Sequence, residues 1–294
     1  EISTRDWSSD VCSSDLSLLR QTHSTMRMHM SERTLSQHGK NNAMGLRTPA
    51  SPVVDDWLTN TLGYPCFSLR IASEGIVDYE SIGREAGVRF LITSEISHDQ
   101  GIASLSILPG ETREMASRTL LKRPVQGEGD HDLLPTLESF RPSKSEVDEI
   151  ADIASNAFAH SRFAEDPRIG DEAAKRVKRR WARNLATGAR GEWFAAIRAG
   201  ERMAGFIGVV RQEGVTDKEP KLLIDLVAVA KDLQGQGIGD QLLTWACDYA
   251  DAQQLELWTS TQSTNRAALG MYANRGFEFH QQTRVFHTMP RDIV

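Results

Sequence analysis

The run Leu226–Gly239 (LVAVAKDLQGQGIG) constrains the fold of this chain more than any other segment. An apolar strand leads into a glycine-rich loop, and an amphipathic helix follows directly. Glycine has no Cβ, so Gly235, Gly237 and Gly239 allow a ligand to approach the backbone closely. Backbone N–H groups at the start of a helix favour an anion. The run therefore predicts a strand, loop and helix that hold an anionic group such as a diphosphate.

Two better-known glycine loops do not fit this run. The acidic residue expected about 20 residues after a dinucleotide-binding loop, beyond a second strand, is not evident. No Lys-Ser or Lys-Thr pair follows Gly239, so the run is not a P-loop. Glycines alone are weak evidence, and a glycine-rich turn that binds nothing is the structural alternative.

The strand before the loop could offer its backbone to the same ligand. From the twofold alternation of a β-strand, we expect Leu223, Asp225, Val227 and Val229 to share one face. If this strand separates from its neighbour, its N–H groups become available to an extended ligand.

The last predicted helix carries two polar side chains on one face. Asn265 and Tyr272 are seven residues apart, which places them about 10 Å from each other along the helix axis. Together they could line a thin, extended ligand. Two structural alternatives stay open, because Asn265 could cap the helix and Tyr272 could fill the core.

Composition excludes several classes of protein. The chain carries 34 Lys and Arg against 40 Asp and Glu, and this net charge of −6 argues against a general nucleic-acid binder. The three cysteines lie far apart and the eight histidines show no metal-ligand spacing, so we predict neither a disulfide framework nor a metal site. No apolar run approaches the length of a membrane span. These features predict a cytoplasmic protein.

The N-terminal residues carry little information about the fold. Residues 6–16 (DWSSDVCSSDL) look like the translation of a sequencing adapter. We therefore exclude residues 1–25 and expect the true start at a methionine between residues 26 and 30 or shortly after. Residues 26–50 are polar and are predicted to be disordered.

The remainder divides into two predicted domains. Residues 51–120 are predicted to form a small α/β domain, and residues 121–140, rich in charge, Gly and Pro, a linker. Residues 141–294 are predicted to form the second domain. The small domain is expected to contain strands at 65–72 and 89–96 around a helix at 78–87. The second is expected to contain helices at 143–158 and 171–186, strands at 193–198, 203–211 and 221–229, the helix after the glycine loop, a strand at 255–261, a helix at 264–275 and a strand at 277–289.

The motifs resemble those of the GCN5-related N-acetyltransferases. Gln234, Gly237 and Gly239 match the family pattern Gln/Arg-x-x-Gly-x-Gly/Ala. Asn265 and Tyr272, followed by Gly276-Phe277, match a second family pattern. The resemblance implies an α/β (α+β) fold with a central mixed, mostly antiparallel twisted sheet flanked by helices and preceded by the small domain. It also implies acetyl-CoA as the acetyl donor.

The same resemblance implies roles for individual residues. Tyr272 falls at the position of the general acid. The residues implied to contact acetyl-CoA are Val227, Ala228, Val229, Gln234, Gly235, Gln236, Gly237, Ile238, Gly239, Asn265 and Arg275. Asp225 could accept the proton of the acceptor amine through a water, and a surface or ion-paired carboxylate is the structural alternative for it.

One branch of the family offers a closer resemblance. Residues 157–163 (AFAHSRF), the opening Asp56-Trp57 and the small domain resemble the TDP-fucosamine acetyltransferases. This implies that the acceptor is the amine of a nucleotide sugar such as dTDP-4-amino-4,6-dideoxygalactose, and that Arg162 and Phe163 contact it. A structural salt bridge is the alternative for Arg162.

Two other functions stay open from the sequence. The chain could acetylate another small amine or a peptide N-terminus, or it could bind CoA without turnover. Homodimers are common in the family that the motifs resemble, so a homodimer is a further expectation.

Overall fold

The computed structural model describes residues 53–70, 90–97, 110–127, 139–158, 161–213 and 219–290. The predictions for residues 1–50 and the predicted helix at 78–87 lie outside these ranges.

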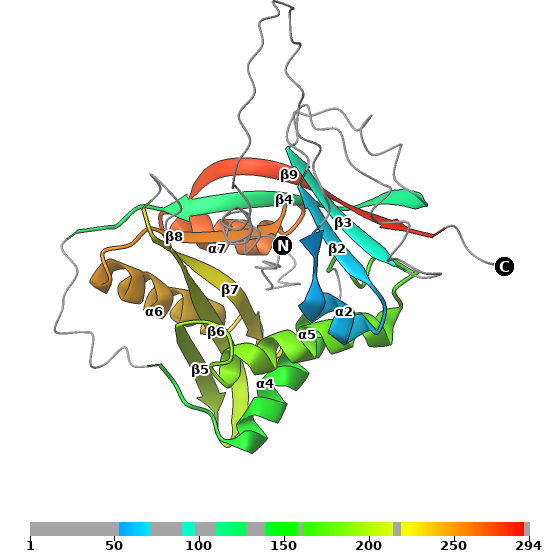
Figure 1. The fold of residues 1–294 in the computed structure, drawn as a ribbon. Coiled ribbons are helices and arrows are strands. Elements are labelled where there is room, and N and C mark those ends of the chain that lie inside the picture. Colours follow the sequence, from blue (N-terminus) through cyan, green and yellow to red (C-terminus); the bar gives the residue numbers. More distant parts are fainter. Residues whose placement is uncertain are drawn as a thin grey trace, which may run out of the picture.

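In the described part of the chain, nine strands form one sheet in the order β1-β2-β3-β9-β4-β8-β7-β6-β5 (Figure 1). The pairs β2–β3 and β7–β8 are parallel, and the other neighbours are antiparallel. This is the predicted mixed, mostly antiparallel sheet. The strands are β1 (Val53–Val54), β2 (Cys66–Arg70), β3 (Leu91–Ser97), β4 (Glu111–Arg123), β5 (Trp193–Ala199), β6 (Arg202–Gln212), β7 (Lys221–Val229), β8 (Leu257–Gln262) and β9 (Glu278–Met289).

Helices pack on both faces of the sheet (Figure 1). On one face, α4 and α5 bury Ile150 and Trp181 against Leu226 of β7. On the other face, α6 and α7 bury Leu242 and Tyr272 in a second apolar cluster with β5 to β8. The helices are α2 (Asp56–Leu62), α4 (Lys144–Ala157), α5 (Asp171–Ala186), α6 (Ile238–Ala252) and α7 (Arg266–Asn274), with a short 3₁₀ turn at Lys231–Leu233. Among the described residues, no helix is long and apolar enough to cross a membrane.

Local sequence signals placed the helices of the C-terminal half correctly. The capping box predicted at Ser143 and Glu146 is present, because the Ser143 side chain accepts from the Glu146 N–H and the Glu146 carboxylate accepts from the Ser143 N–H. α5 covers the predicted range 171–186, and its buried stripe includes the expected Val177, Trp181 and Leu185. A 3.6-residue periodicity with a clear cap was sufficient here.

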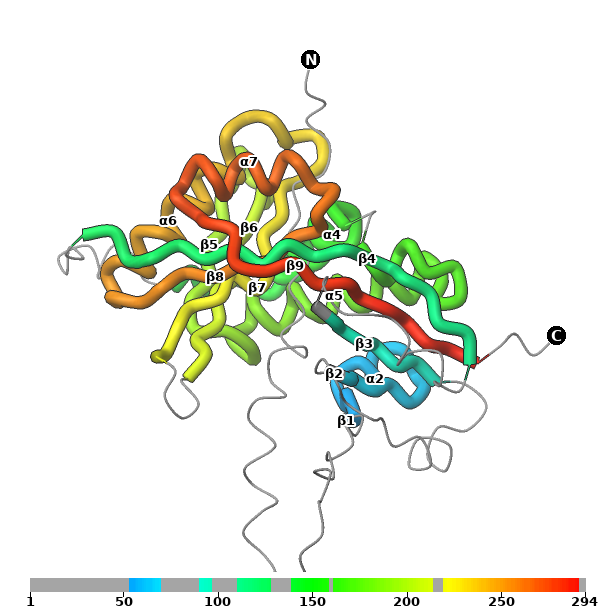
Figure 2. The backbone as a smooth tube through the Cα atoms, turned by 90° about the horizontal axis from the view of Figure 1, so that it is seen from above, coloured from blue at the N-terminus to red at the C-terminus, as the bar shows by residue number. Residues whose placement is uncertain are grey.

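Strand β4 is a correction to the sequence analysis. Leu121–Arg123 were predicted to begin the linker, but they form the last residues of this strand. β4 pairs with β8 on one side and with β9 on the other, as the neighbouring tubes in Figure 2 show. A strand from the predicted N-terminal domain thus lies inside the sheet of the predicted C-terminal domain. The division into two domains stays a prediction.

Candidate active site

Strands β7 and β8 form a fork. Their parallel pairing joins Leu222 to Leu257 and Leu223 to Trp258, and the ladder between these two described strands ends there. β7 continues to Val229 and β8 to Gln262, so both strands extend beyond their last shared pair. The condition stated above, that the strand before the glycine loop separates from its neighbour, is therefore met.

A β-bulge at Asp225 explains why the strands part. Gly208 of β6 lies opposite Leu226 and Val209 lies opposite Ile224, which leaves Asp225 as the extra residue on β7. A bulge bends its strand and increases its twist. This one directly follows the last pair between β7 and β8, so it turns the remainder of β7 away from β8.

The bulge also corrects the predicted face of β7. Val227 and Val229 belong with Ile224 to the cluster beneath α6 and α7. Asp225 instead bonds to Trp181 of α5, which packs on the opposite face. The expectation that Asp225 shares a face with both valines is wrong, because one inserted residue reverses the alternation.

Asp225 is a buried, ion-paired carboxylate. Its side chain is 0 % exposed, and its Oδ2 accepts from Trp181 Nε1 at 2.7 Å. Arg190 approaches in the forked geometry, with Nε 2.6 Å from Oδ2 and Nη2 3.0 Å from Oδ1. This is the ion-paired alternative given above, and it ties the bulge to α5 and to the loop that follows it. A role for Asp225 as a base stays a prediction.

The backbone of Val229 faces the open side of the fork. The N–H of Ala230 donates to the carbonyl of Ala204 on β6 at 2.8 Å. Because successive residues of a strand point their N–H and C=O groups to opposite edges, those of Val229 point away from β6. The Val229 carbonyl accepts from Gln234 Nε2 at 3.2 Å. A side chain of the glycine loop thus takes the position that β8 would occupy in a continuous ladder.

The glycine loop has the conformation that its sequence predicts. Gly235 and Gly237 have φ values of 78° and 83°, which side chains with a Cβ rarely adopt. Gly237 is the N-cap of α6, and residues 235–237 are exposed. Their backbone therefore lies open at the N-terminus of a long helix, the arrangement that favours a phosphate group. Ile238 and the buried Gly239 begin the helix itself.

α7 brings Tyr272 to the same cluster as Val227 and Val229. The Tyr272 ring is 0 % exposed and packs 5.2 Å from the ring of Phe277. Asn265 is the N-cap of α7, since its Oδ1 accepts from the Ala268 N–H at 3.1 Å. This is the capping alternative for Asn265, and its contact with acetyl-CoA stays a prediction.

Arg275 connects the end of α7 to the start of α6. It is the C-cap residue of α7, and its Nε lies 3.0 Å from Oδ1 of Asp240 in the first turn of α6. The ion pair fixes the two helices next to the glycine loop. Its contact with acetyl-CoA also stays a prediction.

Arg162 and Phe163 lie in the loop between α4 and α5. Both are buried, and the Arg162 guanidinium stacks on the Phe163 ring at 4.7 Å. Phe163 belongs to an apolar cluster with α2, α5 and the strands β2, β3 and β9. The structure therefore places Phe163 in a core next to the N-terminal strands. Contact of either residue with a substrate stays a prediction.

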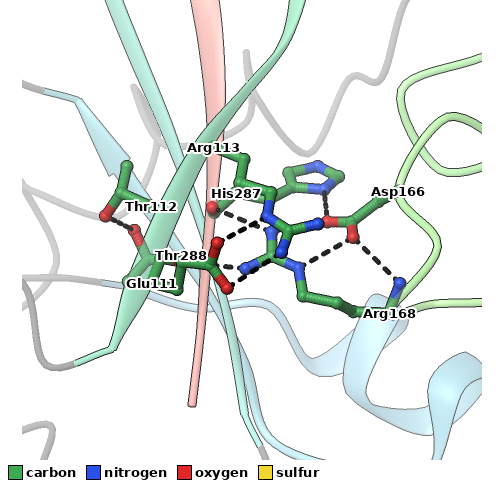
Figure 3. Close-up of polar contacts among 7 residues, drawn as sticks. All are labelled: Glu111, Thr112, Arg113, Asp166, Arg168, His287 and Thr288. Atoms are coloured by element: carbon green, nitrogen blue, oxygen red, sulfur yellow. Dashed lines mark hydrogen bonds and ion pairs between the residues drawn. The ribbon is translucent and has the colours of Figure 1, made fainter. Parts of the chain in front are cut away.

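The same loop is attached to β9 by polar contacts that the sequence analysis missed (Figure 3). Asp166 Oδ2 lies 3.0 Å from His287 Nδ1, and Arg168 donates to both oxygens of Asp166 at 2.8 Å. Arg168 also donates to the Glu111 carbonyl of β4 at 2.8 Å. Burial alone would raise the pKa of Asp166, but the hydrogen bonds from His287 and Arg168 outweigh it and hold the pKa well below its usual range. Asp166 and Arg168 closely follow Phe163 in the chain, but nothing local pointed to His287.

The described residues contain no group of three or more His, Cys, Asp or Glu side chains that could hold a metal ion.

Comparison with known proteins agrees with this architecture. Residues 149–277 match the model of the acetyltransferase (GNAT) family. The chain is 26% identical over 157 residues to the spore coat polysaccharide biosynthesis protein SpsD of Bacillus subtilis (strain 168), in an alignment that covers 53% of this chain and 52% of SpsD. The chain therefore spans about half the length of this curated relative.

One solved structure shares the fold over most of its length. A functionally unknown conserved protein from Staphylococcus epidermidis ATCC 12228 aligns with a TM-score of 0.51 at 13% identity, covering 83% of this chain and 92% of that one. An acetyltransferase from the GNAT family from Colwellia psychrerythraea aligns with a TM-score of 0.41 at 14% identity, covering 67% and 64%.

Proposed function

We propose that this protein transfers the acetyl group of acetyl-CoA to the amine of an amino-sugar nucleotide, because residues 149–277 match the model of the acetyltransferase (GNAT) family. The acceptor that we propose resembles dTDP-4-amino-4,6-dideoxygalactose.

The fork between β7 and β8 is the observation that carries the proposal. An extended thioester-bearing arm needs backbone partners along its length, and the edge of β7 beyond Leu223 offers them. The exposed glycine loop at the end of β7 suits the pyrophosphate of CoA. Tyr272 lies in the cluster that includes Val227 and Val229. An exposed loop at a helix N-terminus, an open strand edge and a phenol are the three features that binding of acetyl-CoA would use, and each supports the proposal.

The proposed reaction is a direct transfer. The neutral amine attacks the thioester carbonyl, and the new C–N bond forms as the C–S bond breaks. The Val229 N–H stabilises the oxygen that becomes negative, and one such donor is typically worth about 3 kcal/mol. Tyr272 donates its phenolic proton to the departing thiolate, and its phenolate takes back the proton that the attacking nitrogen loses as it becomes an amide. A thiol has an ordinary pKa of about 8.5, so a weak acid is sufficient.

The proton of the acceptor ammonium is released to water in this proposal. Asp225 is engaged by Arg190 and Trp181. We therefore propose that it anchors the bulge that opens the fork.

The choice of acceptor rests on two observations outside the fork. The motifs of residues 157–163 resemble the enzymes that acetylate nucleotide-linked amino sugars, and the relative SpsD is named for polysaccharide biosynthesis. Both favour a sugar amine over a peptide N-terminus.

Thiol release from acetyl-CoA tests the proposal. The amines are dTDP-4-amino-4,6-dideoxygalactose, its UDP counterpart, cyclohexylamine and a short peptide. We expect rapid thiol release with a nucleotide amino sugar, and thermal stabilisation by dTDP or UDP alone because the nucleotide belongs to the substrate. Turnover with the peptide or with cyclohexylamine in preference to the sugars would contradict the acceptor class. Binding of acetyl-CoA without thiol release from any amine would contradict the activity.

A further inference from the structure

A charged pair, with Arg118 buried and Glu95 half-buried, lies on the face of the sheet that α4 and α5 also cover. Arg118 of β4 is 5 % exposed, and its Nη2 donates to Ser260 Oγ of β8 at 2.8 Å. Its Nη1 lies 3.5 Å from Glu95 Oε1 of β3. The same Glu95 oxygen accepts from the Thr283 hydroxyl of β9 at 2.7 Å. Four side chains from four strands thus form one polar group.

The strand register also places this polar group on the face of the sheet that α4 and α5 cover. Arg118 lies opposite Thr283, and Glu95 lies opposite Val285, two residues farther along β9. Side chains two apart on a strand share a face, so Thr283 and Val285 point the same way, together with His287. His287 contacts the loop between α4 and α5 through Asp166. The polar group therefore faces the side of the sheet on which that loop lies.

Ser260 connects this group to the fork. The last pair between β7 and β8 joins Leu223 to Trp258, and Ser260 is two residues farther along β8 on the same face. Arg118 therefore holds a residue of β8 at the point where β8 has left β7. Asp225 lies two residues after Leu223 on the other branch, so the fork has a charged residue next to each branch on this face.

The surroundings of Arg118 favour a ligand over a closed core. Glu95, Thr283 and Gln262, which lie around the guanidinium, are each half-buried, whereas Arg118 at their centre is buried. Removing two charges from water is costly, and apolar residues would join four strands at least as well. Side by side, the pair offers N–H donors from Arg118 and a carboxylate acceptor from Glu95. Sugar hydroxyl groups, which donate and accept at once, match this combination.

We propose that Arg118 and Glu95 bind hydroxyl groups of the acceptor, so that strands from the N-terminal half determine acceptor specificity. This inference rests on the proposed function and extends it. The carboxylate of Glu95 balances the charge of Arg118, so the bound part of the acceptor is hydroxylated and uncharged. The amine reaches the fork past Ser260.

Three variants test this role. Arg118→Gln removes the guanidinium, and Glu95→Gln keeps the size of its side chain and an oxygen for Thr283. Arg284→Gln is the matched control, because Arg284 also belongs to an ion pair between β9 and β4, with Glu114, but alternates to the opposite face. For each variant, acetyl-CoA binding is measured by calorimetry and melting temperature by thermal unfolding before kinetics.

We expect Arg118→Gln to raise KM for the sugar amine about 10- to 100-fold, because a hydrogen bond to a charged group is lost. Glu95→Gln should raise it about 10-fold. KM for acetyl-CoA and its calorimetric Kd should not change, and Arg284→Gln should behave like the wild type in every assay. Cyclohexylamine has no hydroxyl groups for the pair to bind. Its inhibition constant in competition with the sugar amine should therefore be the same for both variants as for the wild type.

Two results would overturn the inference. One is an unchanged KM for the sugar amine in both Arg118→Gln and Glu95→Gln. The other is an equal loss for acetyl-CoA and for the sugar amine, which would assign the pair to the packing of the sheet. Failure of the proposed function looks different, because the wild-type protein itself would then bind acetyl-CoA without releasing thiol.

Discussion

Tyr272 gives the sharpest test of the proposed chemistry at the level of a single residue. Tyr272→Phe keeps the ring packed on Phe277 and removes the proposed proton donor. We expect kcat to fall about 10²- to 10⁴-fold, the usual contribution of a general acid, with acetyl-CoA affinity nearly unchanged. Steady-state kinetics and calorimetry separate the two quantities.

Tyr249→Phe is the control for that variant. Tyr249 is a second buried tyrosine whose hydroxyl donates to Glu192 at 2.7 Å, and its ring stacks on Trp193. Loss of this hydrogen bond should cost about 1 kcal/mol of stability without a change in kcat. A kcat for Tyr272→Phe equal to that of the wild type would remove the general-acid role.

The conformation of single residues was predictable where their spacing in the sequence alone indicates it. Gly235 and Gly237 adopt the positive φ values that a glycine loop implies, whereas the role of Tyr272, inferred from its spacing to Asn265, stays a prediction. The bulge at Asp225 was not predictable, because nothing in an apolar strand marks where one residue is inserted. The position of Asp225 depends on its hydrogen bonds with Trp181 and Arg190. Both residues lie far from Asp225 in the sequence, so no local pattern predicts these contacts.

Elements were predictable where their stabilising contacts are local. α4 begins at a capping box formed within four residues, and it was found with its boundaries. β4 was missed because Glu111–Arg123 (ETREMASRTLLKR) carries charged residues on both faces and two register irregularities against β9. The charges have partners on other strands, such as Arg284 for Glu114 and Glu95 for Arg118. A strand stabilised by such distant partners shows no alternation of its own.

The attachment of the α4–α5 loop to β9 predicts a pH-dependent stability. Burial lowers the pKa of His287; the hydrogen bond to Asp166 opposes this effect, and the charges of Arg162 and Arg168 add to it. Arg113 of β4 and Thr93 of β3 face the same ring across the ladder. His287 therefore takes up a proton at a lower pH in the folded protein than in the unfolded chain, where an imidazole takes one up below about pH 6.5.

The sign follows from proton uptake. Below pH 6.5 the unfolded state binds more protons, so the contribution of His287 is complete above that pH and decreases as the pH falls. We expect the free energy of unfolding to fall by up to about 1.4 kcal/mol per pH unit from this group. The lowered pKa of Asp166 acts only below about pH 4, because the unfolded carboxyl titrates there.

Urea unfolding at pH 7.5, 6.5 and 5.5 measures this slope. His287→Gln cannot take up a proton, so its stability should be lower at pH 7.5 but should change less between pH 7.5 and 5.5. His280→Gln, on the exposed part of the same strand, should keep most of the wild-type slope. Identical slopes for His287→Gln and the wild type would show that His287 is not the titrating group.

At the scale of the whole molecule, the sheet joins the two halves of the chain. β4 pairs with β8 from Arg118 to Arg123 and with β9 from Glu111 to Lys122. The family match at residues 149–277 includes neither β4 nor β9. The fork between β7 and β8 therefore lies next to β4, a strand from outside the matched segment. In our proposal, the same strand carries the acceptor-binding Arg118.

This arrangement predicts that the C-terminal half does not fold alone. Without β4, the facing edges of β8 and β9 would expose unpaired N–H and C=O groups, and the apolar cluster that contains Leu257 would lose Leu121. We expect residues 141–294 to show no cooperative thermal transition and no thiol release. Residues 51–294 should match the full chain in both assays, and separate addition of residues 51–140 to the shorter fragment should restore a transition. Cooperative unfolding and turnover by residues 141–294 alone would instead establish two separable domains, and β4 would then be an accessory strand.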